Sequence, residues 1–392
     1  MKVCIVGTVN MPIPRVEYGG IEEVILRASI ELAKMGCDIH ILTVGSNKNL
    51  ESKIIKGVNI HEISRVSLPT ADMSTRALKR LMFGHRVSQA VDNLGGFDVI
   101  HLNVGYSGWE IVLRKQRVPV VFTVHNSYPW LASWSSILTL NYFERVYLNM
   151  NDTLTQFVAK RVNRVLPVSS HMGEAVIRKG VDPKRVKVIF NSVDSERFYP
   201  ILNAKKYFIE KYSIPSDKVL FLFLGGLRIE KGIDYLLRAF QELSKYYNNV
   251  FLLIAGKGHQ RDYLETLAKS LKIDNIKFLG SVCEHDLPIV YSACDVYVLP
   301  SILEPGALTL LEALASGKPI IITRDLGKDF IEDGKQGFLV PTRDWRKIFE
   351  AMVNCMDATV RKKMGVEALE RSKSFTWKEH AKQLLKTYNE LI

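Results

Sequence analysis

The chain has 392 residues, of which 47% are hydrophobic and 24% are charged. This length is too great for one ordinary hydrophobic core and suits two domains, and the composition excludes a low-complexity chain. The net charge of +12 is concentrated in residues 1–192, where 24 Lys and Arg accompany 15 Asp and Glu.

A basic first half indicates an acidic partner, such as an anionic membrane face or a phosphate-bearing acceptor, with a generic basic surface as the alternative. Nucleic acid is not expected, because no zinc-finger or RRM signature is found. The sequence has no run of eighteen apolar residues, so no membrane span is expected. A buried strand expected at Val3–Gly7 leaves no room for a signal peptide. Five scattered cysteines without a CxxC pair predict reduced thiols and a cytoplasmic location, with the cytoplasmic membrane face as a variant.

Apolar runs alternate with helix-period segments through the first half of the chain. The expected strands are Val3–Gly7, Ile39–Val44, Val99–Leu102, Val120–Val124 and Arg164–Val168. The expected helices include Ile21–Lys34, Thr75–Asn93 and Glu174–Lys179. Repeated strand–helix units predict a parallel sheet with helices on both faces.

The same pattern starts again after a hinge expected near residues 190–200. The second set of expected strands is Lys218–Leu224, Val250–Ala255, Ile276–Leu279, Val296–Leu299 and Pro319–Ile322. The predicted fold is α/β, with two doubly wound, Rossmann-like domains at 1–192 and 193–375, the first completed by a terminal helix at 376–392. Because such sheets bind ligands at the carboxyl ends of their strands, the two domains are expected to face each other across a cleft.

The window Val298–Gly317 contains two glutamates, Glu304 and Glu312, in a specific setting. A buried strand is expected to end at Pro300, a loop carries Glu304, and a helix is expected from near Ala307 to the stop at Gly317. Two ordinary surface glutamates are the alternative interpretation.

The N-terminus of that helix is a candidate site for a diphosphate. The backbone at Gly306, Ala307 and Leu308 would offer free N–H groups and the positive end of the helix dipole. Glu312 would lie roughly 7.5 Å along the helix axis, where a carboxylate could hold a ribose diol. Glu304 would reach in the other direction, to the hydroxyls of a sugar.

Arg228 and Lys231 follow a predicted strand and open a helix. Cations at this place would neutralise the charge on a departing diphosphate, and a solvated helix start is the alternative. No Asp-x-Asp and no His/Cys cluster with zinc spacing occurs in the sequence, so no metal is expected.

Two further candidates lie in the first half. Gly19 and Gly20 precede the helix expected at Ile21, where glycines let the backbone approach a phosphate or sugar closely, although a glycine pair alone is usually a turn. His125 ends a predicted strand and could hydrogen-bond a sugar hydroxyl. A structural histidine is the less favoured alternative for His125, and it carries more weight for His101.

Together these segments resemble glycosyltransferase family 4, the retaining nucleotide-sugar transferases with the GT-B fold. The window with Glu304 and Glu312 resembles the family's E-x7-E motif. Six further signatures occur in the family's order: Tyr18-Gly-Gly-Ile-Glu22, Phe97-Asp-Val-Ile-His101, Phe122-Thr-Val-His125, Asn191-Ser-Val-Asp194, Leu224-Gly-Gly-Leu-Arg-Ile-Glu-Lys-Gly232 and Phe375-Thr-Trp377. The resemblance covers nearly the whole chain.

The resemblance implies retaining transfer of a hexose from a UDP-, GDP- or ADP-sugar to a hydroxyl acceptor, without a metal or a separate cofactor. It implies catalytic roles for His125, near the 6-position of the donor sugar, and for Glu304 and Lys231. It also implies a front-face displacement in which the leaving phosphate takes the acceptor's proton. Backbone contacts to the base are expected near Ser281–Cys283, around Val282.

Two positions depart from the family pattern. The arginine of the family's phosphate loop falls at the place of Gly226, so Arg228 is expected to replace it. Gly306 and Ala307 stand where a bulky residue and a glycine are common, so the sugar pocket is expected to have a different shape.

The acceptor is expected on the first domain. Asn126–Phe143 are uncharged and rich in aromatic residues, while Arg76, Lys79, Arg80 and Arg86 share one expected helix. This combination suits peripheral attachment to an anionic bilayer and a lipid-linked acceptor, and an amphipathic helix beside a buried aromatic cluster is the alternative. The rival functions are a nucleotide-sugar epimerase or hydrolase on the same fold, a nicotinamide-dependent dehydrogenase, and a binding module without activity.

Overall fold

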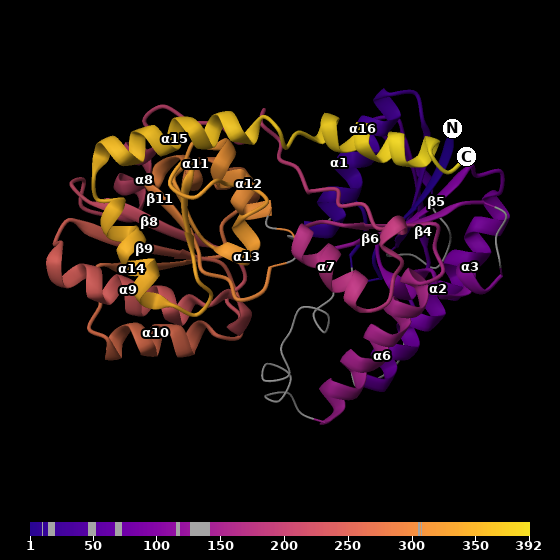
Figure 1. Cartoon of the computed structure of the whole chain (residues 1–392), viewed down its shortest axis with the longest axis horizontal. Coiled ribbons are helices and arrows are strands. Elements are labelled where there is room, and N and C mark those ends of the chain that lie inside the picture. The colour runs from indigo at the N-terminus through magenta and orange to yellow at the C-terminus, as the bar shows by residue number, and fades with distance from the viewer. Residues whose placement is uncertain are drawn as a thin grey trace. The chain divides into compact units, whose positions relative to one another are not determined.

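The computed structural model describes residues 1–9, 11–14, 20–45, 52–66, 73–114, 118–125, 142–304, 306 and 308–392, without the side chains of 73–76 and 142–150. Two compact units make up the chain (Figure 1). Unit 1 consists of Met1–Asn191 and Trp377–Ile392, and unit 2 consists of Ser192–Thr376. The predicted site residues Gly19 and Ala307 lie outside the described residues, as does most of the aromatic segment 126–143.

Unit 1 is built on a seven-stranded sheet. In sheet order the strands are β3 (Ser52–Ile55), β4 (Val58–Ile63), β2 (Asp38–Val44), β1 (Lys2–Val6), β5 (Val99–Leu102), β6 (Val120–Val124) and β7 (Arg164–Pro167). The helices are α1 (Gly20–Lys34), α2 (Met73–Leu94), α3 (Trp109–Leu113), α6 (Tyr142–Ala159), α7 (Ser170–Arg178) and α16 (Trp377–Asn389). All neighbouring strands are parallel except the β3–β4 pair.

The hairpin β3–β4 is the part of this sheet that the apolar pattern did not predict. Its strands are joined by Lys56 and Gly57, which both have positive φ angles (48° and 82°). The residues of β3 are exposed or half-buried, so no buried apolar run marks the strand. This antiparallel edge extends an otherwise parallel sheet, as is common in doubly wound folds.

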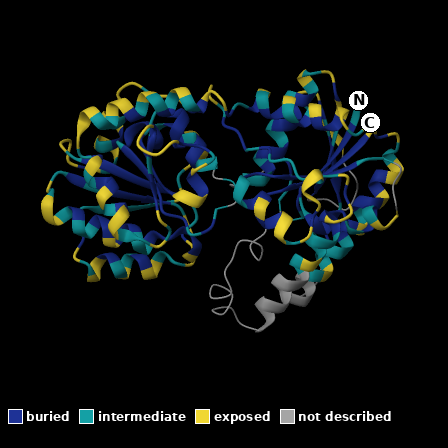
Figure 2. Cartoon of the chain, viewed as in Figure 1, coloured by how far each residue is buried: buried dark blue, intermediate teal, exposed yellow. Residues whose placement is uncertain are grey.

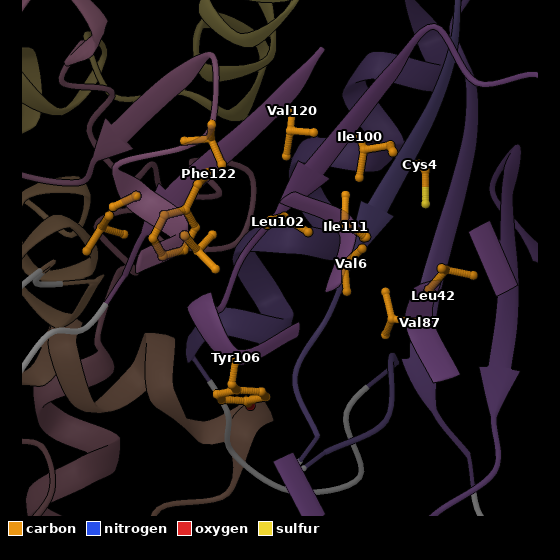
Figure 3. Close-up of a cluster of buried hydrophobic side chains, with 14 of the residues drawn as sticks. Cys4, Val6, Leu42, Val87, Ile100, Leu102, Tyr106, Ile111, Val120 and Phe122 are labelled. Carbon is orange, nitrogen blue, oxygen red and sulfur yellow. The ribbon is translucent and has the colours of Figure 1, made fainter. Parts of the chain in front are cut away.

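The core of unit 1 lies on both faces of the sheet. On β1, Cys4 and Val6 pack into one cluster with residues of α2 such as Val87 (Figure 3). Val3 and Ile5 pack into a second cluster on the other face, with residues of α16. Successive side chains of a strand point to opposite faces, so burial on both faces requires the continuous apolar run that predicted this strand.

Unit 2 is built on a six-stranded parallel sheet. In sheet order the strands are β10 (Ile276–Gly280), β9 (Val250–Ala255), β8 (Val219–Leu224), β11 (Val296–Leu299), β12 (Ile320–Thr323) and β13 (Gly337–Val340). The helices are α8 (Ala204–Tyr212), α9 (Ile233–Tyr246), α10 (Arg261–Ser270), α11 (Leu287–Ala293), α12 (Leu308–Ala315), α13 (Arg324–Gly327), α14 (Trp345–Asn354) and α15 (Ala358–Ser372). The central strands β5 and β6 of unit 1 and β8, β11 and β12 of unit 2 are buried along their whole length (Figure 2).

The five strands expected here are confirmed within one residue at each end, and β13 was missed. β13 is only four residues long, and its first residue, Gly337, supplies no apolar side chain. A Cβ atom at Gly337 would lie 1.9 Å from the carbonyl oxygen of Ile320, so the glycine lets β13 pack against β12.

The helix after β11 is shorter than expected. α12 spans Leu308–Ala315, and Gly317, with a φ angle of 67°, ends it. The amide of Gly317 donates to Leu314 (2.9 Å) and that of Lys318 donates to Ala313 (3.1 Å), as in a Schellman cap. Within the described residues, no helix is both long and apolar enough to cross a membrane.

Candidate functional site

Three of the candidate donor residues of unit 2 lie in the segments that follow two neighbouring strands, β8 and β11. From β8 the chain continues through β9 to β10 on one side, while β11 to β13 lie on the other side. This change of direction is the place where open parallel sheets bind ligands. The loop after β8 carries Arg228 and Lys231, and the loop after β11 carries Glu304.

An ion pair between Lys231 Nζ and Glu304 Oε2 joins these two loops. The two side chains are only 10% and 13% exposed, and Ser301 Oγ lies 3.5 Å from the same carboxylate oxygen. The backbone carbonyl of Glu230 also accepts hydrogen bonds from the amides of Ile302 (2.7 Å) and Leu303 (3.3 Å). Two residues predicted to act on one substrate, 73 positions apart, are thus in contact.

Glycines allow the loops of unit 2 to pack closely against each other. Gly232 has a φ angle of 62°, and a Cβ atom there would lie 2.4 Å from the carbonyl oxygen of Pro300. Cβ atoms at Gly256 and Gly258 would lie 1.8 Å and 2.1 Å from the carbonyl oxygens of Gly225 and Leu227. Gly256 and Gly258 were not predicted, and the signal that could have found them is a glycine pair directly after β9.

Arg228 occupies the space next to Gly226. A Cβ atom at Gly226 would lie 3.5 Å from Arg228 Nε, so the arginine covers the place where a side chain at 226 would begin. The Arg228 side chain is 52% exposed and pairs with Glu230, at 2.6 Å from Nε to Oε1. Arg228 therefore lies beside position 226, and its role as a replacement for an arginine there stays a prediction.

Glu312 lies on α12 and is held by a residue that the sequence did not reveal. The fully buried Tyr291 of α11 donates its hydroxyl proton to Glu312 Oε2 (2.7 Å). Since α12 begins at Leu308, Glu312 is roughly 6 Å along the axis, closer to the helix start than expected. The amide of Leu308 donates to the carbonyl of Gly306 (2.9 Å), so this predicted phosphate donor is engaged in a turn. Val282 is half-buried and follows β10.

His125 directly follows β6 in unit 1 and is buried. Its Nε2 lies 2.8 Å from Oδ1 of Asn103, and Nδ2 of Asn103 donates to the carbonyl of Val6 (3.1 Å). Burial, with a smaller contribution from His380, lowers the pKa of His125 to about 3. The imidazole is therefore neutral near pH 7 and suited to hydrogen bonding.

His101 uses both ring nitrogens for contacts within the protein. This fits the structural alternative, which had more weight for His101 than for His125. Nδ1 lies 2.6 Å from the hydroxyl of Tyr388 on α16, and Nε2 lies 2.7 Å from Oγ1 of Thr123. Both ring nitrogens are thus occupied within the protein. Burial lowers the pKa of His101 to about 3 and that of the nearby His380, whose Nδ1 donates to Phe190 O at 2.8 Å, to about 4.

The start of α1 carries a second buried pair that was missed. Gly20, a predicted donor-binding residue, is the first residue of α1. Two residues later, the buried Glu22 accepts a hydrogen bond of 2.5 Å from the hydroxyl of Thr8, which follows β1. Among the residues that the structure describes, no group of three His, Cys, Asp or Glu side chains could hold a metal ion.

Comparison with known proteins assigns the chain to a family. The model of Glycosyltransferase Family 4 matches residues 18–197, and the model of Glycosyl transferases group 1 matches residues 205–370. A D-inositol 3-phosphate glycosyltransferase of Corynebacterium kroppenstedtii is 27% identical over 398 residues, which cover 96% of this chain and 86% of the relative.

Two solved structures have the same fold. Sucrose-phosphate synthase from Thermosynechococcus elongatus has a TM-score of 0.82 and 22% identity, with 100% of this chain and 98% of that chain covered. Anabaena HepE in complex with UDP and glucose has a TM-score of 0.74 and 18% identity over the whole of both chains. The two matching models, the full-length relative and the pair of parallel-sheet α/β units agree, and the chain belongs to the GT-B glycosyltransferases.

Proposed function

We propose that this glycosyltransferase moves a sugar from a nucleotide-diphosphate-sugar to a hydroxyl acceptor, with retention of the anomeric configuration and without a metal. The carrying observation is the Lys231–Glu304 ion pair between the loops after β8 and β11. In this proposal the ribose is held by Glu312, the diphosphate by Lys231, Arg228 and the start of α12, and the base by backbone near Val282. HepE, whose structure holds UDP, supports this donor class for a protein of the same fold.

The Lys231–Glu304 pair suggests how the donor enters. Both side chains are largely buried, so each charge needs a partner when no ligand is bound. A diphosphate carries more negative charge than one carboxylate, and it would take Lys231 as its counterion. Glu304, released from Lys231, would then accept hydrogen bonds from the sugar hydroxyls.

The chemistry proposed is a front-face displacement. The bond between the anomeric carbon and the donor phosphate breaks, the acceptor oxygen attacks from the same face, and its proton passes to the leaving phosphate. Lys231 and Arg228 would stabilise the charge that develops on that phosphate. In this proposal His125, Gly19 and Gly20 would contact the donor from unit 1.

The acceptor is proposed to bind unit 1 beside an anionic membrane face. α2, α3 and α6 line a partly open pocket of about 370 Å³, whose walls are mainly apolar and include Leu81, Trp109 and Phe157, with Arg80 beside them. This lining suits the apolar part of a lipid-linked acceptor. Arg86 of the same helix donates to the carbonyl of Ser64 (2.6 Å), so its charge is partly used within the protein.

Vesicle flotation tests the membrane contact. Phosphatidylglycerol vesicles are expected to retain the parent chain and to release a variant with Arg76, Lys79 and Arg80 changed to Gln, at low ionic strength. Equal retention of the two proteins would overturn the membrane proposal and would leave the donor proposal untouched.

Donor hydrolysis without an acceptor tests the reaction. The protein is incubated in EDTA with UDP-, GDP- and ADP-glucose, and the sugar released first is identified by proton NMR. We expect slow release of α-glucose from one α-linked donor, at least 100-fold slower for Glu304→Gln. Release of β-glucose would contradict retention, and a requirement for Mg²⁺ would contradict metal independence. An isomerised nucleotide-sugar would instead identify an epimerase.

A further inference from the structure

Three neighbouring parallel strands of unit 1 bring a histidine and an amide together at their carboxyl ends. β5 lies between β1 and β6, with Val6 opposite Leu102 and Leu102 opposite Phe122. Asn103 directly follows β5, so its side chain can reach both neighbouring strands. It bonds to the carbonyl of Val6 (3.1 Å) on one side and to His125 Nε2 (2.8 Å) on the other, and all three residues are buried.

The donor and the acceptor of both hydrogen bonds, from Asn103 to Val6 and between His125 and Asn103, follow from the groups involved. The carbonyl oxygen of Val6 can only accept, so the NH₂ group of the Asn103 amide must face it. The amide oxygen therefore faces His125, and because this oxygen can only accept, His125 Nε2 must carry a proton. Burial keeps the ring neutral by lowering its pKa to about 3, so Nδ1 is left with a lone pair.

His101, in the same sheet, is a histidine whose tautomer is not determined by its partners. Its two partners are the hydroxyls of Tyr388 and Thr123, and each hydroxyl can either donate or accept. Neither tautomer of His101 is selected, and both nitrogens are occupied. For His125, by contrast, no hydrogen bond to Nδ1 is found among the residues that the structure describes.

We propose that Asn103 is a positioning residue that holds His125 in the Nε2–H tautomer, so that Nδ1 recognises a hydroxyl group of the donor sugar by accepting its hydrogen bond. The sugar in this proposal rests on the proposed function, whereas the tautomer does not. A hydrogen-bond acceptor at this position selects for a ligand that has a hydroxyl and against one in which the hydroxyl is replaced by an acceptor alone.

NMR of the ligand-free protein tests the tautomer. Histidine rings labelled with ¹⁵N are observed in two-bond proton–nitrogen spectra, and His125→Gln identifies the His125 signals by their loss. We expect a protonated Nε2 and an unprotonated Nδ1 in the parent protein. Asn103→Asp keeps an acceptor facing the ring and is expected to keep that tautomer, whereas Asn103→Leu is expected to lose it. A protonated Nδ1 in the parent, or an unchanged pattern in a folded Asn103→Leu, would overturn the proposal.

Sugar analogues test the direction of the ligand contact. UDP-glucose is compared with its 6-deoxy and 6-deoxy-6-fluoro analogues, because fluorine cannot donate a hydrogen bond. Both analogues are expected to lose about tenfold in kcat/KM in the parent protein and much less in Asn103→Leu. Turnover of the fluoro analogue at the parent rate, with the deoxy analogue impaired, would show that His125 donates and would contradict the proposal. If UDP-glucose is not used at all, the proposed donor class fails, while the NMR result still decides the role of Asn103.

Discussion

The carboxyl edges of the two sheets are stabilised in different ways. In unit 1, the edge is held by hydrogen bonds between buried side chains and backbone, as in the chain from Val6 through Asn103 to His125. In unit 2, the edge is held by glycines that allow close backbone contact and by the ion pair of Lys231 with Glu304.

This difference indicates a division of labour between two sheets of the same type. Neutral donors and acceptors recognise hydroxyl groups, whereas a cation beside closely packed backbone suits a diphosphate. In the proposed reaction, the edge of unit 2 would bind the charged leaving group, and the edge of unit 1 would contact the sugar and the acceptor.

The largest effect is expected from removing the charge at position 231. Lys231→Met leaves Glu304 without its counterion and removes the cation proposed to bind the diphosphate, so transfer or donor hydrolysis is expected to fall about 100- to 1,000-fold. Lys335→Met, which removes an exposed lysine 3.5 Å from Glu332, is the matched control and is expected to be silent. Activity within threefold of the parent would contradict the assignment of Lys231.

A smaller but structural effect is expected at Gly232. A methyl group there would lie 2.4 Å from the carbonyl oxygen of Pro300 and would be strained by the φ angle of 62°, so Gly232→Ala is expected to destabilise by about 2–4 kcal/mol. Gly334 has a φ angle of 79° with nothing within 4 Å, so Gly334→Ala is expected to cost only the backbone term, about 1 kcal/mol. Urea denaturation measures the free energy of unfolding of both variants. Equal losses would mean that close contact with Pro300 does not add to the cost at Gly232.

The neutral histidines make the stability of unit 1 sensitive to acid. Burial lowers the pKa values of His101 and His125 to about 3 and that of His380 to about 4, below the ordinary value of 6.5. The unfolded chain therefore binds more protons as the pH falls below 6.5, and stability is lost progressively in that direction. Each histidine is expected to contribute up to about 2 kcal/mol of this loss between pH 7.5 and 5.

Hydrogen exchange resolves this pH effect by unit. After correction for intrinsic rates, the amides of β5 and β6 are expected to lose protection at pH 5, while those of β8 and β9 change less. His380→Gln can still donate to the carbonyl of Phe190 and is expected to reduce the pH dependence, whereas a change at the exposed His285 is expected to have no effect. Equal losses of hydrogen-exchange protection in the two units would contradict the expected acid sensitivity of unit 1.

The smallest effect is expected at Tyr291. Tyr291→Phe removes the hydroxyl that donates to Glu312 (2.7 Å) and leaves the packing intact, so affinity for a nucleoside diphosphate is expected to fall up to about tenfold. Tyr263→Phe, at a side chain that is 52% exposed, is the control. Calorimetric titration measures the affinity of both variants for the nucleoside diphosphate. An unchanged affinity in Tyr291→Phe would contradict the proposal that Glu312, as held by Tyr291, binds the ribose.

The fold was predictable because its determinants are local. A strand buried on both faces needs a continuous apolar run, as at Val250–Ala255, and such runs marked all but three of the strands. The exceptions are β3 and β4, which form an edge hairpin, and the four-residue β13. The residues of β3 are exposed or half-buried, polar residues interrupt the apolar pattern of β4, and β13 is short and begins with a glycine.

The sequence could suggest site residues only where a motif contains them, and their roles stay predictions. Lys231 and Glu304 stand in glycine-rich or proline-flanked loops, which the sequence displays directly. Tyr291 and Asn103 were not predicted, because each contacts a residue that only packing brings close: Glu312 on the next helix, and His125 directly after the next strand. No spacing in the sequence records such contacts between elements.

The central claim is that the charged edge of unit 2 binds the diphosphate of a nucleotide-sugar, and thermal unfolding with UDP, GDP and ADP tests it most directly. In EDTA, one diphosphate at 100 times its Kd is expected to stabilise the protein by about 2.7 kcal/mol, and Lys231→Met is expected to abolish that stabilisation. Stabilisation that persists in Lys231→Met, or no response of the folded parent protein to any of the three, would contradict the account.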